Sequence, residues 1–269
     1  MPCIVTVMTS TTTRKVALIT GATSGMGLTI AQHLAKQDFA VFLCARSEES
    51  LSQTIKQLQT DGYEADGVTC DVTSPEQIRA YVAAAVDRFG PVDILVNNAG
   101  RNGGGITKDI TDELWFDVIN TNLNSVFLMT KAALTTGGML DQGWGRIINI
   151  ASTGGKQGVL HGAPYSASKH GMVGFTKALG LELAKTGVTV NAVCPGFVET
   201  PMAERVRETY ATLWGVDAEE AGKRVAARVP IGRYVDTEEV AAMVDYLISP
   251  GANAVTAQAL NVCGGLGNY

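Results

Sequence analysis

Short apolar runs alternate with longer amphipathic segments along most of the chain, and this alternation restricts the possible folds more than any other feature. The runs are rich in β-branched residues and nearly continuous in apolar character, as are strands covered on both faces. Seven such runs lie at residues 16–20, 40–45, 66–70, 93–97, 146–151, 188–193 and 258–262. Segments with a helical pattern lie between them, at 25–37, 48–60, 75–89, 112–136, 164–186 and 237–248. Repeated strand–helix units with right-handed crossovers predict an α/β fold, a doubly wound parallel sheet with helices on both faces.

The length and composition agree with one large domain. The chain has 269 residues, of which 46% are apolar and 17% charged, so a sizeable core is expected. No internal repeat or linker divides it. We therefore expect a single domain over residues 14–269 after a loose tail at 1–13. Residues 197–233 interrupt the alternation and are too long for an ordinary loop, which predicts a substrate lid.

Composition also argues against several classes of protein. The net charge of −5 lacks the basic balance expected of proteins that bind nucleic acid or an anionic membrane. No apolar run approaches the length of a membrane span, and the opening residues do not form a convincing signal peptide. The five cysteines are scattered, which predicts reduced thiols in a cytoplasmic protein. The three histidines have no metal-ligand spacing, so no metal site is predicted.

A glycine-rich turn, TGATSGMG at residues 20–27, follows the first strand and opens the first helix. Gly21 allows a tight turn, Gly25 allows a pyrophosphate to approach the backbone, and Gly27 allows the helix to pack on the strand. The helix N-terminus supplies N–H donors for phosphate groups. This setting predicts a nucleotide site, although glycine-rich turns are common without one.

The residue after the second strand indicates which nucleotide would bind. An acidic residue at this position commonly bonds the ribose of NAD, but here the position is occupied by Arg46. A cation suits the 2′-phosphate of NADP(H), so NADPH is the predicted cofactor. A solvated surface arginine is the alternative.

Four polar residues are candidates for catalysis. Tyr165 and Lys169 are four positions apart in a helical segment, so they lie on nearly the same face. Lys169, aided by the charge of the cofactor and by a helix N-terminus, could lower the pKa of the tyrosine towards neutrality. Ser152 follows the fifth strand, and such folds bind ligands at the carboxyl ends of their strands. Its hydroxyl could bond both a substrate carbonyl and Tyr165. Asn122 lies within a helical segment, where a buried amide needs partners.

Taken together, these residues resemble the short-chain dehydrogenase/reductase family over about residues 14–269. The matching motifs are TGATSGMG, Asn97-Asn98-Ala99-Gly100, Asn122, Ser152, Tyr165 with Lys169, and Pro195-Gly196. The resemblance implies a Rossmann-type sheet and hydride transfer from a nicotinamide, with Tyr165 as acid/base and Ser152 orienting the carbonyl. Lys169 would bond the nicotinamide ribose and lower the tyrosine pKa, and Asn122 would hold a water that returns the proton.

The resemblance also implies a set of cofactor contacts. They are Gly21, Thr23, Ser24, Gly25, Met26, Gly27, Arg46, Asp71, Val72, Asn98, Gly100, Tyr165, Lys169, Pro195, Gly196, Val198 and Thr200.

A closer resemblance is to the ketoreductases of bacterial aromatic (type II) polyketide synthases, such as that of actinorhodin biosynthesis. It rests on STGGKQGV (152–159), APYSASKHG (163–171), NAVCPGFVETPMA (191–203), RVPIGRY (228–234) and the tail VTAQALNVCGGLGNY (255–269). It implies reduction of one carbonyl, usually at the ninth carbon, of a polyketide carried by or derived from an acyl carrier protein. The implied substrate contacts include Asn102, Gly103, Gly104, Thr153 and Val159. Asn102 stands where the subfamily commonly has proline, which leaves loop rigidity and alcohol configuration open.

The predicted lid carries apolar side chains among charges, including Met202, Tyr210 and Trp214. Such a lining suits a flexible apolar substrate, and packing between two helices is the alternative. Arg101, Arg228 and Arg233 are candidates to meet an acidic carrier protein, unless they are simply solvated. By resemblance, the helical segment at 164–186 and the one before it would build a homotetramer.

The sequence thus predicts an NADPH-dependent polyketide ketoreductase. A fatty-acid-type 3-oxoacyl-[acyl-carrier-protein] reductase or a general carbonyl reductase would use the same chemistry. A nucleotide sensor without catalysis is a third hypothesis, which the complete set of Asn122, Ser152, Tyr165 and Lys169 disfavours.

Overall fold

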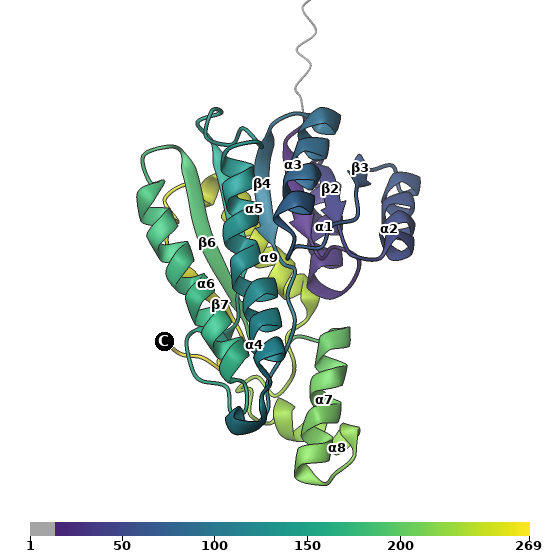
Figure 1. Ribbon diagram of the computed structural model, residues 1–269, viewed down its shortest axis with the longest axis vertical. Coiled ribbons are helices and arrows are strands. Elements are labelled where there is room, and N and C mark those ends of the chain that lie inside the picture. Colours follow the sequence, from purple (N-terminus) through teal and green to yellow (C-terminus); the bar gives the residue numbers. More distant parts are fainter. Residues whose placement is uncertain (1–13) are drawn as a thin grey trace, which may run out of the picture.

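A single parallel sheet organises the part of the chain that the computed structural model describes, residues 14–269 (Figure 1). The tail predicted at 1–13 lies outside the described residues. The strand order is β3-β2-β1-β4-β5-β6-β7, which confirms the predicted Rossmann-type fold. The strands are β1 (Val16–Thr20), β2 (Ala40–Cys44), β3 (Ala65–Gly67), β4 (Val92–Asn97), β5 (Gly145–Ile150), β6 (Val188–Pro195) and β7 (Ala259–Val262).

The third strand is shorter than the predicted run at 66–70. Beyond Gly67 the chain keeps only separate hydrogen bonds to the second strand and its end, from Val68 N to Leu43 O and from Cys70 N to Ala45 O.

Helices cover both faces of the sheet. α1 (Gly25–Lys36), α2 (Glu48–Thr60) and α9 (Thr237–Ile248) share one core layer with the sheet, and α3 (Pro75–Phe89), α5 (Ser125–Leu134) and α6 (Ala163–Glu182) share the other. Along β1, Ala17 and Ile19 join the first layer while Val16 and Leu18 join the second. Both faces of this central strand are therefore apolar, which explains why its sequence is a continuous apolar run rather than an alternating one.

The helix predicted at 112–136 is interrupted in its middle. It consists of α4 (Asp112–Ile119), a π-helical turn η2 (Asn120–Asn124) and α5. Asn122 is completely buried within this turn, and its side-chain amide bonds to groups outside the helix. A π-helical turn is a common feature at functional sites, and the local sequence pattern did not reveal it.

The segment at 197–233 folds as two helices, α7 (Pro201–Trp214) and α8 (Ala218–Ala226). They follow the carboxyl end of β6 and project beyond the rest of the domain (Figure 1). Single turns of 3-10 helix complete the fold, at η1 (Thr107–Asp109), η3 (Thr153–Gly155) and η4 (Pro250–Ala252). No helix within residues 14–269 has the length and apolar character needed to cross a membrane.

Candidate functional site

The glycine-rich turn at the carboxyl end of β1 is closely packed. Gly21 and Gly25 have φ angles of 64° and 51°, in the left-handed region that favours glycine. A Cβ at Gly27 would lie 2.2 Å from the main-chain oxygen of Gly21, so only glycine fits there. The side chain of Ser24, the N-cap of α1, makes no capping hydrogen bond. Free N–H donors at this helix N-terminus could therefore hold a phosphate group.

Asn98 fixes the position of this turn from the neighbouring strand. Its amide donates to Thr20 O and Gly21 O at 2.9 and 3.0 Å. In return, the Thr20 hydroxyl accepts from the main-chain N–H of Asn98 and of Ala99. The predicted supporting role of Asn98 thus has a direct structural counterpart.

The residues expected to contact the adenosine end differ in their exposure. Arg46 is exposed beyond the end of β2 and takes part in no ion pair within the described chain, so it is available to an anionic ligand. Asp71 is half-buried, and its carboxylate accepts from the N–H and hydroxyl of Thr73. Val72 is buried and packs in the core layer of α3.

Ser152 and Tyr165 meet at the carboxyl end of β5. The Ser152 hydroxyl lies near enough to the Tyr165 phenol to favour its charged form, and it accepts from Gly154 N at 3.0 Å. A Cβ at Gly154 would lie 2.9 Å from Val159 Cγ2, 3.2 Å from Tyr165 Cε1 and 3.3 Å from Ser152 Oγ. The structure therefore brings Val159, predicted from resemblance alone, beside the serine and the tyrosine.

Burial governs the electrostatics of Tyr165 and Lys169 in the chain alone. Burial raises the pKa of the Tyr165 phenol, and the hydrogen bond from Ser152 opposes this shift only in part. Burial also lowers the pKa of Lys169 from 10.5 to about 8. The Lys169 ammonium donates to Ile150 O at 2.8 Å and lies 5.9 Å from the centre of the Tyr165 ring. In the chain alone, desolvation has the largest influence on the pKa of Tyr165; that Lys169, the charge of the cofactor and a helix N-terminus together lower it stays a prediction.

Asn122 connects the catalytic candidates to the loop after β4. Its Nδ2 donates to Arg101 O and Ser168 Oγ at 2.9 and 3.1 Å, and its Oδ1 accepts from Arg101 N at 2.8 Å. A Cβ at Gly100 would lie 3.3 Å from Asn122 Oδ1 and 3.7 Å from Lys169 Nζ, so these groups converge. The sequence analysis did not identify Ser168 as a partner of Asn122. Its position between Tyr165 and Lys169 is the one feature of the sequence that could have suggested it. Since both Nδ2 protons are used, only Oδ1 of this side chain has capacity left for a water.

The glycines after Arg101 are tightly enclosed. A Cβ at Gly103 would lie 2.3 Å from Val118, and one at Gly104 would lie 2.0 Å from His161 O. The loop therefore packs on α4 and on the segment leading into α6, near Val159. Asn102 is exposed and its main-chain oxygen accepts from Arg101, whereas Thr153 is buried in η3.

The side chains predicted to line the lid divide between two environments. Tyr210 and Trp214 stack with ring centres 4.6 Å apart and pack with α8 residues, which agrees with the alternative of helix–helix packing. Met202 is half-buried in the first turn of α7.

Of the cofactor contacts predicted after β6, Thr200 lies close to the glycine-rich turn. Thr200 caps α7, and its Cγ2 would be 3.2 Å from a Cβ at Gly25. Val198 is buried and pairs with Val235. Pro195 ends β6, and Gly196 lies against Cys263.

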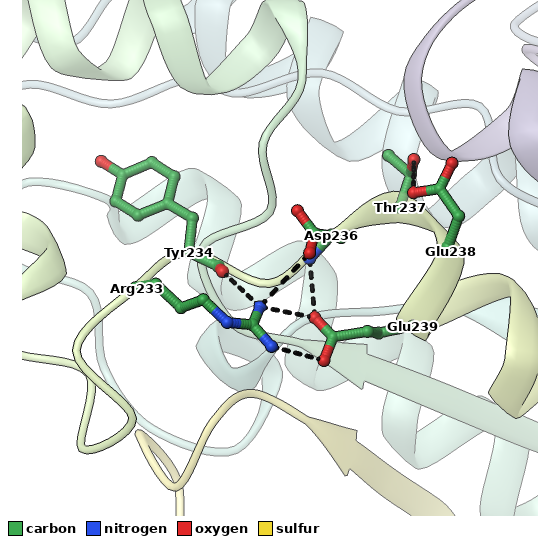
Figure 2. Close-up of polar contacts among 6 residues, drawn as sticks. All are labelled: Arg233, Tyr234, Asp236, Thr237, Glu238 and Glu239. Atoms are coloured by element: carbon green, nitrogen blue, oxygen red, sulfur yellow. Dashed lines mark hydrogen bonds and ion pairs between the residues drawn. The ribbon is translucent and has the colours of Figure 1, made fainter.

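Two of the three arginines considered for carrier-protein contact are neutralised. Arg101 forms an ion pair with Asp117. Arg233 forms a bidentate ion pair with Glu239, with both nitrogen–oxygen distances at 2.8 Å, and a longer ion pair with Asp236 (Figure 2). Arg228 is exposed near the ring of Phe197 and joins no ion pair within residues 14–269. Of the three, Arg228 alone keeps an uncompensated charge in the described structure.

No group of three or more histidine, cysteine, aspartate or glutamate side chains within residues 14–269 is arranged to hold a metal ion.

The chain as a whole is similar to proteins of known families. Residues 15–211 match the short chain dehydrogenase family model. The chain is 70% identical to ketoacyl reductase 1 of the granaticin polyketide synthase of Streptomyces violaceoruber, covering 96% of this chain and 95% of that one. It is 40% identical to a 3-oxoacyl-[acyl-carrier-protein] reductase of Vibrio cholerae, covering 94% and 97%. A crystal structure of a tryptophan variant of the actinorhodin polyketide ketoreductase with NADPH matches with a TM-score of 0.93 and 68% identity, covering 95% and 98%.

Proposed function

Because the chain belongs to the short-chain dehydrogenase family, we propose that it is an NADPH-dependent ketoreductase of a type II polyketide synthase. One observation carries the chemistry: Asn122, Ser152, Tyr165 and Lys169 converge at the carboxyl end of the sheet. The 70% identity to a granaticin ketoacyl reductase and the 68% identity to the actinorhodin ketoreductase support the substrate class.

The structure fits a dinucleotide phosphate. The N-terminus of α1 lacks a side-chain cap, the close contact at Gly27 leaves no room for a side chain, and the charge of Arg46 is not compensated by an acid. The turn from Gly21 to Gly27 would hold the diphosphate, and Arg46 would pair with the 2′-phosphate. When bound, NADPH would supply the hydride.

The chain's own residues would polarise the ketone and move the proton. Ser152 and Tyr165 direct hydroxyl groups to one place and would hydrogen-bond the carbonyl oxygen of the substrate. Tyr165 would donate its proton to that oxygen as the alcohol forms. A tyrosine phenol is protonated at neutral pH, so Tyr165 has a proton to donate. Lys169 lies beside the ring and adds positive charge that stabilises the resulting phenolate.

The substrate we propose is a carrier-protein-linked polyketide whose ninth-carbon ketone is reduced to an alcohol. The loop at 101–105 and Val159 would flank it, together with Met202 at the start of α7. Arg228 would meet the acidic carrier protein, since its charge is free of acidic partners in the described chain.

We further propose that the protein is a homotetramer of the cytoplasm. α5 and α6 expose Phe127 and Leu181, with 50% and 73% of their surface accessible. A Cβ at Gly174 of α6 would meet nothing within 4 Å, so that part of the helix is open to a second subunit. The four cysteines within the described residues are free and buried, as suits a reducing compartment.

The test is NADPH oxidation by wild type and Tyr165→Phe with two substrates, the bicyclic ketone trans-1-decalone and a short linear β-ketoacyl thioester. We expect tyrosine-dependent turnover that favours the bicyclic ketone. Preference for the linear thioester would instead assign a fatty-acid-type reductase, the second candidate favoured by the 40% identity to the Vibrio enzyme. NADPH binding without turnover of any ketone, a carrier-linked polyketide included, would support a sensor.

A further inference from the structure

The ammonium group of Lys156 joins the turn after β5 to the last part of the chain. It donates three hydrogen bonds, to Ala259 O at 3.1 Å, Asn261 Oδ1 at 3.0 Å and Tyr269 O at 2.7 Å. These bonds use all three N–H donors of the lysine. The acceptors are two main-chain oxygens and one side-chain amide oxygen, and Lys156 forms no ion pair with an acidic side chain within residues 14–269.

The segment after β7 is folded back to reach this lysine. Asn261 donates to Gly267 O at 2.9 Å, and Gly267 N donates to the sulfur of Cys263 at 3.3 Å. A Cβ at Gly267 would lie 2.6 Å from the Tyr269 hydroxyl, so the glycine lets the tyrosine pack closely. The Tyr269 hydroxyl points to Thr153 O at 3.4 Å, and its ring lies 5.2 Å from the Lys156 ammonium. The segment therefore contacts both ends of η3.

The same turn holds Ser152. Gly154 N donates to the Ser152 hydroxyl at 3.0 Å, and Gly155 N donates to Ser152 O at 2.9 Å. Lys156 N donates to Thr153 O at 3.0 Å and completes the turn. On its other side, a Cβ at Gly155 would lie 2.6 Å from Lys169 O, so the turn is pressed against α6. Any movement of η3 would consequently displace the serine hydroxyl relative to Tyr165.

We propose that Lys156, anchored by Asn261 and Tyr269, is a positioning residue that holds the Ser152 hydroxyl in place for carbonyl reduction. The proposal rests on the ketoreductase function proposed above. Lys156 itself does not touch the reacting atoms; it acts through the turn from Ser152 to Gly155. Charged donors form stronger hydrogen bonds than neutral ones, which suits a lysine to fix a turn from its end.

Lys156→Met tests the idea because it keeps the apolar stem and removes the donors. A small misplacement of a catalytic group can lower a rate by up to about 100-fold. We expect a fall of about 10-fold in kcat for the ketone, with the KM for NADPH changed by less than about 2-fold. Lys156→Arg, which retains charge and donors, should recover most of the rate. Lys185→Met, at an exposed lysine beyond α6, is the matched control and should behave as wild type.

A double-mutant cycle separates positioning from general loss of stability. In a Ser152→Ala background, Lys156→Met should have less than about 2-fold effect, because the group that Lys156 positions is already gone. An equal fall in both backgrounds would overturn the proposal.

Hydrogen–deuterium exchange provides a readout that does not need activity. The amides of Gly154 and Gly155 donate to Ser152, so Lys156→Met should raise their exchange rates about 10-fold while amides in β1 stay protected. Unchanged exchange in peptide 152–157 would overturn the inference even if the enzyme reduces ketones. If the wild-type protein turns over no ketone, the proposed function fails. The exchange experiment still tests Lys156 in that case: raised exchange in Lys156→Met shows that the lysine holds the turn, and unchanged exchange shows that it does not.

Discussion

Replacing Lys169 by methionine should change how the stability of the protein depends on pH. Burial lowers the pKa of Lys169 to about 8 in the folded chain, against an ordinary value of 10.5. Between these values the unfolded chain binds more protons than the folded one, so the contribution of this group to the unfolding free energy rises with pH. Its destabilising effect is fully present below pH 8 and is relieved as the pH approaches 10.5.

The two pKa values give the size of this effect. Between pH 7 and pH 9.5, the contribution of Lys169 should become more favourable by about 2 kcal/mol. The methionine variant lacks this titration, while other ionisable groups contribute to both proteins. The difference in unfolding free energy, wild type minus variant, should therefore rise by about 2 kcal/mol over that range.

Urea unfolding followed by circular dichroism at the two pH values measures this difference. Lys177→Met, at an exposed lysine of the same helix, controls for the loss of a surface charge. A difference between wild type and Lys169→Met that stays constant within about 0.5 kcal/mol would refute the depressed pKa. It would also remove the argument that Lys169 is held in a desolvated site beside Tyr165.

Further perturbations address the cofactor turn, the lid and the surface. Gly27→Ala should lower the unfolding free energy by about 3 kcal/mol, since its Cβ would lie 2.2 Å from Gly21 O. Gly158→Ala is the control, because a Cβ there would meet nothing within 4 Å, and its unfolding free energy should stay near that of wild type. Urea denaturation of the two variants and wild type measures the difference. Arg46→Asp should raise the KM for NADPH about 10- to 100-fold and leave that for NADH within about 3-fold, and equal effects on both would exclude a 2′-phosphate contact. Trp214→Ala should spare NADPH binding, measured by fluorescence, but change the ratio of activities on bulky and small ketones; an unchanged ratio would argue against a lid. Arg228→Glu should weaken turnover of carrier-linked substrate in a salt-dependent way without affecting trans-1-decalone, and a loss with both would place Arg228 at the active site.

The order of the elements and much of the nucleotide site could be predicted from local patterns. Continuous apolar runs identify strands buried on both faces, and a glycine cluster between strand and helix identifies the turn that begins at Gly21. The four-residue spacing of Tyr165 and Lys169 places them on one helical face without knowledge of the rest of the chain. The predicted parallel sheet and the shared face of Tyr165 and Lys169 are confirmed, because each depends on residues close together in sequence, and the nucleotide site stays a prediction.

Contacts between distant residues were decided only by the tertiary structure. Asn122 meets Arg101 and Ser168 because the loop after β4 and the helix α6 pack around the π-helical turn. Burial, which no local pattern reveals, raises the pKa of Tyr165 in the chain alone.

The ion pairs of the arginines were likewise decided by the tertiary structure and not by local sequence. Sequence position alone made Arg101, Arg228 and Arg233 equal candidates for an acidic partner, but the fold supplies Asp117 to the first and Glu239 to the third. The contact of Lys156 with Tyr269 joins positions 113 residues apart and has no local signal. The sequence by itself determined which segments become strands, helices and turns, since those follow from periodicity and backbone preference. The protonation, pairing and positioning of the site residues depend on desolvation and on neighbours brought by packing, and only the tertiary structure decided them.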